Sequence, residues 1–123
     1  MLNTNNEVMT QKKIGIGFGT WAWGNKLVWG YKPETDDILL KKTFFDAIDG
    51  GLDFVDSADS YGTGSLFGQS EKLIGNFLEE LPRRKLKKIT IATKLAPFPW
   101  RIGRNGLNYA FQESNKRLKG HMK

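Results

Sequence analysis

Three side chains in this sequence have the types and spacing needed for acid–base chemistry: Asp56, Tyr61 and Lys94. Asp56 lies near the end of the apolar run 52–58, and Lys94 lies near the end of the β-branched run 89–95. If the two runs are neighbouring strands, the carboxylate and the ammonium can pair, which keeps the lysine charged. A tyrosine on the loop above such a cation has a pKa below its usual value of about 10, because the positive charge favours the phenolate. The pattern therefore indicates a phenol that acts as a general acid or base near neutral pH.

Each of the three residues also has a purely structural interpretation. A carboxylate at the end of a strand often caps the next loop, a loop tyrosine often packs, and a lysine at a strand end is often solvated. Spacing alone leaves both interpretations open. The chemical interpretation requires that the two strands end at the same edge of one sheet.

The rest of the chain alternates strand patterns with helix patterns three times. Strands are predicted near residues 14–19, 52–58 and 89–95. The second helix is expected to open at Ser70 and to stop at Pro82, because proline cannot continue a helix. The apolar positions that define the three helical faces are Leu40, Phe44, Ala47 and Ile48, then Ile74, Phe77, Leu78 and Leu81, then Leu107, Ala110, Phe111, Ser114 and Leu118.

This alternation predicts an α/β fold with parallel strands and right-handed crossovers. Two architectures fit it, a doubly wound open sheet and a (β/α)8 barrel. The dinucleotide-binding open sheet needs a G-x-G-x-x-G motif that begins a helix directly after the first strand. Here Gly15, Gly17 and Gly19 lead instead into 21–31, an aromatic and glycine-rich segment that predicts a loop. In both architectures ligands bind at the C-terminal ends of the strands, which is where the acid–base residues lie.

Composition narrows the function classes further. The 123 residues include no Cys and one His, His121, which excludes a disulfide framework, a Cys-based zinc site and a multi-His metal site. The sequence has no run of about 18 apolar residues, so no membrane span is predicted. The polar residues 1–13 lack the apolar stretch of a secretory signal. We therefore expect a cytoplasmic protein without a bound metal.

The chain is basic, with 19 Lys and Arg against 13 Asp and Glu and a net charge of +6. The densest run of cations, 83–88, lies between a helical segment and a predicted strand. This position favours a solvated connection, with cations near a helix C-terminus, over a nucleic-acid patch. Nucleic-acid binding rests on the charge alone and is the weakest of the functional hypotheses.

Several segments together resemble the aldo-keto reductases, in the order in which that family has them. The matching segments are GFGTWAWG at 17–24, FVDSADSYG at 54–62, GQSE at 68–71 and IATK at 91–94. The segments around WGY at 29–31 and PWR at 99–101 are most similar to the pyridoxal reductase-like members of plants and cyanobacteria. The resemblance extends from about residue 14 to residue 118.

The resemblance implies an oxidoreductase that reduces an aldehyde or ketone with NADPH, built on a (β/α)8 barrel. By matching motif, Tyr61 gives the proton to the carbonyl oxygen, Lys94 lowers the tyrosine pKa, and Asp56 holds the lysine. Asp56 is also expected on the cofactor side, together with Gly19, Thr20 and Trp21. Pyridoxal is the first substrate that the resemblance suggests. Ser57 stands where many relatives have Thr, which keeps the hydroxyl group.

The length departs from the family. A full (β/α)8 barrel takes about 250 residues, whereas this sequence supplies three strand–helix units. We predict a polar N-terminal segment at 1–13, a truncated aldo-keto reductase barrel at 14–120 and a short tail at 121–123. His121 comes too early, and without a preceding strand, to match the family's catalytic histidine. The acid–base trio is thus expected to be present while most of the cofactor site is absent.

Two interpretations follow from this expectation. The chain is an oxidoreductase by descent, or it is a non-catalytic remnant that persists by association. In the second case the partner is another copy of the chain or a separately encoded C-terminal half, because a short parallel sheet leaves both edges unpaired.

Overall fold

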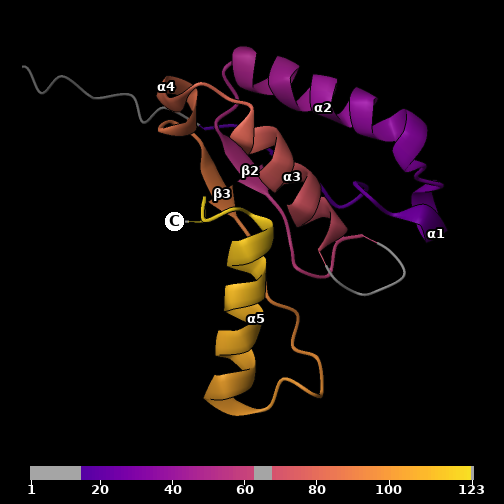
Figure 1. The fold of residues 1–123 in the computed structure, drawn as a ribbon, viewed down its shortest axis with the longest axis vertical. Coiled ribbons are helices and arrows are strands. Elements are labelled where there is room, and N and C mark those ends of the chain that lie inside the picture. The colour runs from indigo at the N-terminus through magenta and orange to yellow at the C-terminus, as the bar shows by residue number, and fades with distance from the viewer. Residues whose placement is uncertain (1–14, 63–67, 123) are drawn as a thin grey trace, which may run out of the picture.

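The computed structural model describes residues 15–62 and 68–122. Its strands form one parallel sheet in the order β1-β2-β3 (Figure 1). The elements in chain order are β1 (Gly17–Gly19), α1 (Lys26–Trp29), α2 (Pro33–Asp49), β2 (Phe54–Asp56), α3 (Gln69–Glu79), α4 (Arg83–Leu86), β3 (Thr90–Ala92) and α5 (Gly103–Arg117). The α/β fold with parallel strands is confirmed, and each strand lies inside its predicted range but is shorter.

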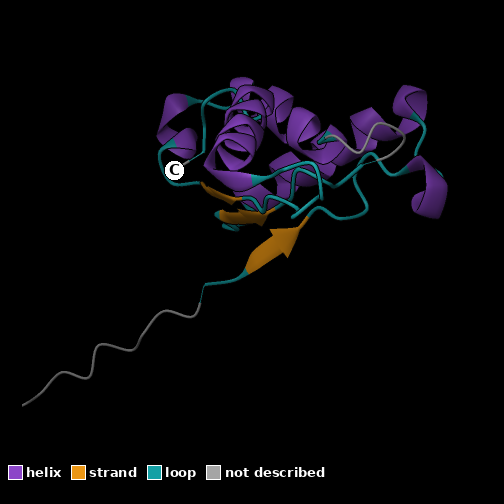
Figure 2. Ribbon diagram, turned by 90° about the horizontal axis from the view of Figure 1, so that it is seen from below, coloured by secondary structure: helices purple, strands orange, loops and turns teal. Residues whose placement is uncertain are grey.

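The helices cover one face of the sheet and leave the other open (Figure 2). Phe18, Val55 and Ile91 are paired across the three strands, and Val55 and Ile91 are buried beneath the helices. The neighbouring position on β2, Phe54, points to the opposite face and is 41% exposed. In a closed barrel this second face is the packed interior. The open face is therefore the inner wall of a partial barrel.

The core is an aromatic cluster between the sheet and the two long helices that follow β1 and β2. Phe44 on α2 is its centre and has no exposed surface. Its ring centroid lies 5.7 Å from Phe77 on α3, 6.1 Å from Phe18 on β1 and 6.3 Å from Trp23. Edge-to-face and tilted contacts of this kind add to the gain from burial. The predicted apolar faces of α2 and α3 thus meet each other and the sheet.

Local signals explain the ends of α2. Pro33 occupies the first helical position, and the Asp36 carboxylate accepts the Lys32 backbone N–H at 2.7 Å. At the other end Gly50 caps the helix and Gly51 takes a φ of +98°, a conformation open to glycine. The chain can therefore turn sharply from α2 into β2.

Three local details differ from the sequence prediction. The segment 21–31 contains a one-turn helix, α1, whose start is capped by the Asn25 side chain. The basic run contains another, α4, after Pro82. Gly68, not Ser70, caps α3, because the Ser70 hydroxyl is engaged with the loop after β1.

The last helix buries only part of its predicted face. Ala110, Ser114 and Leu118 are buried, whereas Leu107 and Phe111 are 47% and 53% exposed. The small residues let α5 approach α3 closely. The two exposed apolar residues do not share that contact.

A substitution at Gly75 of α3 would show how closely α5 approaches this helix. A Cβ atom at this position would lie 2.1 Å from the Arg117 carbonyl oxygen. Helix propensity alone predicts that alanine stabilises the helix by about 1 kcal/mol. We expect instead that Gly75→Ala lowers the free energy of unfolding by about 1–3 kcal/mol, because the backbone oxygen cannot move away without repacking. Urea unfolding followed by circular dichroism measures the change.

Asn76→Ala is the matched control, because Asn76 is the exposed neighbour on the same helix. It should raise stability or leave it unchanged. Equal stabilisation by both substitutions would contradict the close approach of α5.

Candidate active site

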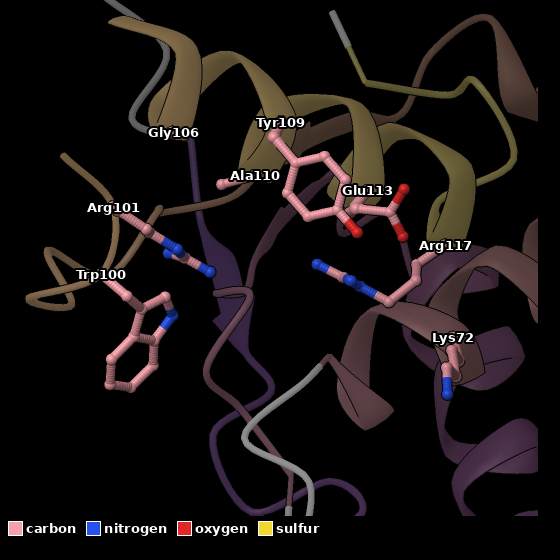
Figure 3. A pocket seen from close by; sticks show the side chains of 8 residues that line it. All are labelled: Lys72, Trp100, Arg101, Gly106, Tyr109, Ala110, Glu113 and Arg117. Atoms are coloured by element: carbon pink, nitrogen blue, oxygen red, sulfur yellow. The ribbon is translucent and has the colours of Figure 1, made fainter. Parts of the chain in front are cut away.

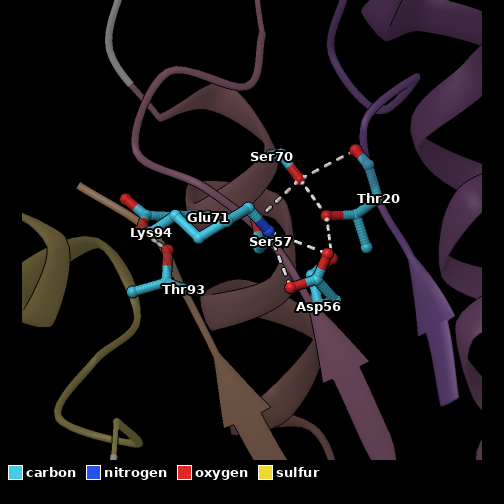
Figure 4. Close-up of polar contacts among 7 residues, drawn as sticks. All are labelled: Thr20, Asp56, Ser57, Ser70, Glu71, Thr93 and Lys94. Carbon is cyan, nitrogen blue, oxygen red and sulfur yellow. Dashed lines mark hydrogen bonds and ion pairs between the residues drawn. The ribbon is translucent and has the colours of Figure 1, made fainter. Parts of the chain in front are cut away.

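Asp56 and Lys94 meet at the C-terminal edge of the sheet. Asp56 is the last residue of β2 and pairs in register with Ala92 on β3, so Lys94 follows two residues later. The Lys94 Nζ atom donates to both carboxylate oxygens of Asp56, at 2.7 and 2.8 Å (Figure 4). The parallel register thus creates the pair that the spacing of the two residues predicted.

The surroundings keep Lys94 in its charged form. Partial burial lowers the pKa of Lys94, but the hydrogen bond and charge of Asp56, with a smaller contribution from Tyr61, outweigh it and raise the pKa above its ordinary value. Both side chains of the pair are about half exposed. Lys94 is therefore an ammonium throughout the neutral pH range, accessible from the open face of the sheet.

Tyr61 stands over this ammonium. Its ring centroid lies 5.2 Å from Lys94 Nζ. The backbone fixes the loop that carries it, because the Tyr61 N–H donates to the Ala58 carbonyl at 3.1 Å and its own carbonyl accepts the Ser70 N–H at 3.2 Å. The structure thus brings all three predicted acid–base residues together.

Tyr31 offers a contrast to Tyr61. It is buried and its hydroxyl donates to Asp37. Burial first, and then the hydrogen bond to the Asp37 carboxylate, raise the pKa of Tyr31 to about 12. Such a phenol stays protonated at neutral pH. Tyr61, by contrast, lies beside the Lys94 ammonium.

A buried group of three hydroxyls supports this edge from behind. The Thr20 hydroxyl donates to the Asp56 carbonyl at 3.2 Å, and Ser70 donates to the Thr20 hydroxyl at 2.7 Å. The Ser57 and Ser70 hydroxyls lie 3.2 Å apart (Figure 4). These contacts tie the ends of β1 and β2 to the first turn of α3. The position of Asp56 is therefore held from two sides.

The residues expected on the cofactor side differ in exposure. Thr20 has no exposed surface, and its hydroxyl faces the protein interior. Trp21 is 57% exposed, and Gly19 has open space around the position of a side chain. Gly19 and Trp21 are therefore accessible to a ligand, whereas Thr20 acts by positioning Asp56.

Two buried ion pairs escaped the sequence analysis. In the first, the fully buried Asp59 carboxylate lies 2.5 Å from Arg101 Nη1 and accepts the Ala96 N–H at 3.0 Å. The Asp59 N–H donates to the Lys94 carbonyl at 2.9 Å. This pair therefore anchors the loop that leaves β3, directly after the lysine. Asp59 belongs to the FVDSADSYG segment that resembles the family, but the sequence does not show that its side chain is buried.

The second pair joins three elements. Glu71 on α3 has no exposed surface, accepts the Thr93 hydroxyl at 2.6 Å and pairs with Arg117 Nε at 2.7 Å. Gly68 faces the same arginine, and a Cβ there would lie 2.1 Å from Nε. Burying a charge is costly unless it is paired. Glu71 is thus a structural anchor between β3, α3 and α5, not a surface carboxylate at a helix start.

Across 15–62 and 68–122, no three His, Asp or Glu side chains are grouped to hold a metal ion. Among the helices in that part of the chain, none is long and apolar enough to cross a membrane.

Residues 15–122 match the model of the aldo/keto reductase family. The chain is 49% identical over 89 residues to the chloroplastic pyridoxal reductase of Arabidopsis thaliana, covering 71% of this chain and 24% of that protein. It is 35% identical over 101 residues to the aldo-keto reductase YhdN of Bacillus subtilis, covering 82% and 26%. A crystal structure of an aldo-keto reductase from Klebsiella pneumoniae in complex with NADPH superposes with a TM-score of 0.61 and 25% identity, covering 85% of this chain and 31% of that one.

The chain therefore spans about a quarter of the length of these curated relatives. The match covers the three strand–helix units and the edge that holds the acid–base residues. By sequence and by fold, this chain belongs to the aldo-keto reductase family.

Proposed function

We propose that these residues form the acid–base part of a carbonyl reductase that uses NADPH. The observation that supports this most is the meeting of Asp56, Lys94 and Tyr61 at the C-terminal edge of a parallel sheet. Ligands bind at this edge in parallel α/β proteins. Family membership adds the reaction class, and the Klebsiella pneumoniae relative adds the cofactor.

The roles we propose are those that the family resemblance implies, and the contacts among the three residues support them. The Tyr61 hydroxyl donates its proton to the carbonyl oxygen of the substrate, and the Lys94 ammonium stabilises the phenolate left behind. Asp56 holds the ammonium beneath the ring and prevents it from turning into solvent. Water restores the proton to Tyr61 after product leaves.

The residues present are compatible with the nicotinamide side of NADPH. The space around Gly19 and the exposed Trp21 ring leave room for a flat group next to the trio. When bound, NADPH supplies the hydride that reduces the carbonyl carbon. Thr20 supports that surface through its bond to Asp56. Residues that would bind the rest of the cofactor belong to the part of the family barrel that this chain does not match.

The substrate we propose to test first is pyridoxal. Its support is the 49% identity to a protein named pyridoxal reductase. That name describes the plant protein, of which the matched region is 24%. The same name places the plant protein in the chloroplast, and a cytoplasmic location for this chain stays a prediction.

The second candidate function is association without catalysis. The open face of the sheet favours it, because Phe54 on that face and Phe111 on α5 are each about half exposed. A monomer in sedimentation would count against it. Nucleic-acid binding has less support, since Lys85 in the basic run pairs with Asp49.

Thermal unfolding with and without NADPH tests the proposal. A ligand that binds only the folded state raises its stability by about 2.7 kcal/mol at a concentration of 100 times Kd. Circular dichroism monitors the unfolding. We expect one cooperative transition whose midpoint temperature rises when NADPH is present. Trp21→Ala, at an exposed residue that directly follows Thr20, should reduce the shift, while Ile38→Ala, at an exposed residue of α2, should not. A cooperative transition that ignores NADPH would contradict cofactor binding by this chain.

A further inference from the structure

A cavity of about 510 Å³ lies between α5, the loop after β3 and the first turn of α3. It shares no residue with the acid–base trio. The side chains that concern its chemistry are Lys72, Trp100, Arg101, Tyr109, Glu113 and Arg117 (Figure 3). Three of the six are cations, and they come from three separate elements.

The two arginines enter the cavity from opposite sides. Figure 3 shows the guanidinium groups of Arg101 and Arg117 pointing toward each other across it. Each side chain is about nine-tenths buried. Each is fixed from behind by a fully buried carboxylate, Asp59 for Arg101 and Glu71 for Arg117. Their positions are therefore set by the fold and do not depend on a ligand.

Both guanidinium groups keep donors to spare. An arginine has five N–H donors. Arg101 uses Nη1, toward Asp59 and the Ala96 carbonyl, and Arg117 uses Nε toward Glu71 and Nη2 toward Ser114. Lys72 at the rim has no ion-pair partner among the described residues. An anion placed between the arginines would receive charge-assisted hydrogen bonds from both and reduce their mutual repulsion.

Aromatic rings border the same space. The Trp100 ring is 58% exposed and stacks on Phe98, with centroids 4.7 Å apart and an interplanar angle of 7°. Arg101 lies over the other ring of this pair, with its guanidinium carbon 4.8 Å from the Phe98 centroid. Tyr109 is exposed on the α5 side. A ligand that reaches the arginines therefore meets a flat, rigidly held aromatic surface.

One residue opposes an anion. Glu113 lines the cavity and pairs with Lys116 at 2.7 Å. The hydrogen bond from Lys116 holds the pKa of Glu113 below its usual range, and the charge of Arg117 contributes in the same direction. Glu113 is therefore ionised and close enough to Arg117 to compete with a bound anion. Its removal should strengthen anion binding.

We propose that this cavity binds a small aromatic anion, a ring that carries a phosphate or carboxylate group. Arg101 and Arg117 hold the anionic group, and the Trp100 face holds the ring. The site goes beyond the proposed reductase function, since none of its residues takes part in the acid–base chemistry. Because Asp59 links Arg101 to the backbone at Lys94, the bound anion would rest against the loop that leaves β3.

Calorimetric titration of the full chain with phenyl phosphate tests the proposal. Inorganic phosphate and phenol are the comparison probes, since each has one half of the ligand. We expect saturable binding of phenyl phosphate, about tenfold or more tighter than either half alone, and weakening as salt rises. Absence of saturable binding, or equal affinity for phenyl phosphate and inorganic phosphate, would overturn the proposal.

Two substitutions with matched controls locate the site. Glu113→Gln should strengthen phenyl phosphate binding about threefold or more, because a repelling charge is removed. Glu80→Gln is its control, since Glu80 is an exposed, lysine-paired carboxylate outside the cavity. Trp100→Ala should weaken binding about tenfold through lost stacking, while the exposed Trp29→Ala should not change it.

If Glu113→Gln and Glu80→Gln strengthen binding equally, the anion responds to net charge and the cavity is not its site. No step of the test requires carbonyl reduction. The result therefore stands whether or not the proposed reductase activity is found.

Discussion

Tyr61→Phe is expected to lower carbonyl reduction by about 100-fold or more, which is the usual contribution of a positioned proton donor. The substitution removes the hydroxyl and leaves the ring over Lys94, so packing at the site is preserved. Turnover is measured from the loss of NADPH absorbance with pyridoxal as substrate. The upward shift of the unfolding transition with NADPH should be unchanged, because the phenol acts on the carbonyl and not on the cofactor.

Tyr109→Phe is the matched control. The substitution removes the same hydroxyl group from a tyrosine of α5 that is 67% exposed and is not a member of the trio. It should leave turnover within about twofold of the parent chain. If the two variants retain equal turnover, Tyr61 is not the proton donor and the assignment by motif is wrong.

Glu71→Ala is expected to lower the free energy of unfolding by about 3–5 kcal/mol, the usual cost of removing one partner of a buried ion pair. Arg117 would keep its charge in a nearly buried position, and the Thr93 hydroxyl would lose its acceptor. A loss of this size is a large fraction of the 5–15 kcal/mol that stabilises a typical domain. Urea unfolding followed by circular dichroism measures it.

The control lies on the same helix. Glu79 is 55% exposed and pairs loosely with Lys119 at 3.8 Å, so Glu79→Ala should cost about 0–1 kcal/mol. A double variant, Glu71→Met with Arg117→Met, removes both charges and should recover most of the lost stability. A cost for Glu71→Ala no larger than that for Glu79→Ala would show that the buried pair does not anchor α5.

Much of the fold could be predicted because it depends on local pattern. Three strand segments alternate with three helical segments, which limits the chain to parallel strands with crossovers. The apolar spacing on α2 and α3 identified Phe44 and Phe77, which meet in the core. Local signals also mark the ends of α2, with Pro33 at its first position and the glycines at 50 and 51 after its last.

The acid–base trio was also predictable, for a geometric reason. In a parallel sheet, residues near the C-terminal ends of neighbouring strands lie at one edge whatever the loops do. Two positions near those ends, Asp56 and Lys94, must then be close, and the Tyr61 loop begins there. The register of β2 and β3 places Lys94 within hydrogen-bond distance of both carboxylate oxygens of Asp56.

The amino-acid sequence by itself thus determined the alternation of elements, the family and the residues of the proposed acid–base site. Only the tertiary structure decided which charges are buried. Glu71 and Arg117 are 46 positions apart, and Asp59 and Arg101 are similarly distant, so no local pattern marks them as pairs. Whether a carboxylate is solvated or buried depends on which segments pack over it. That packing is a property of the assembled chain, because burial and ion pairing arise between elements and not within them.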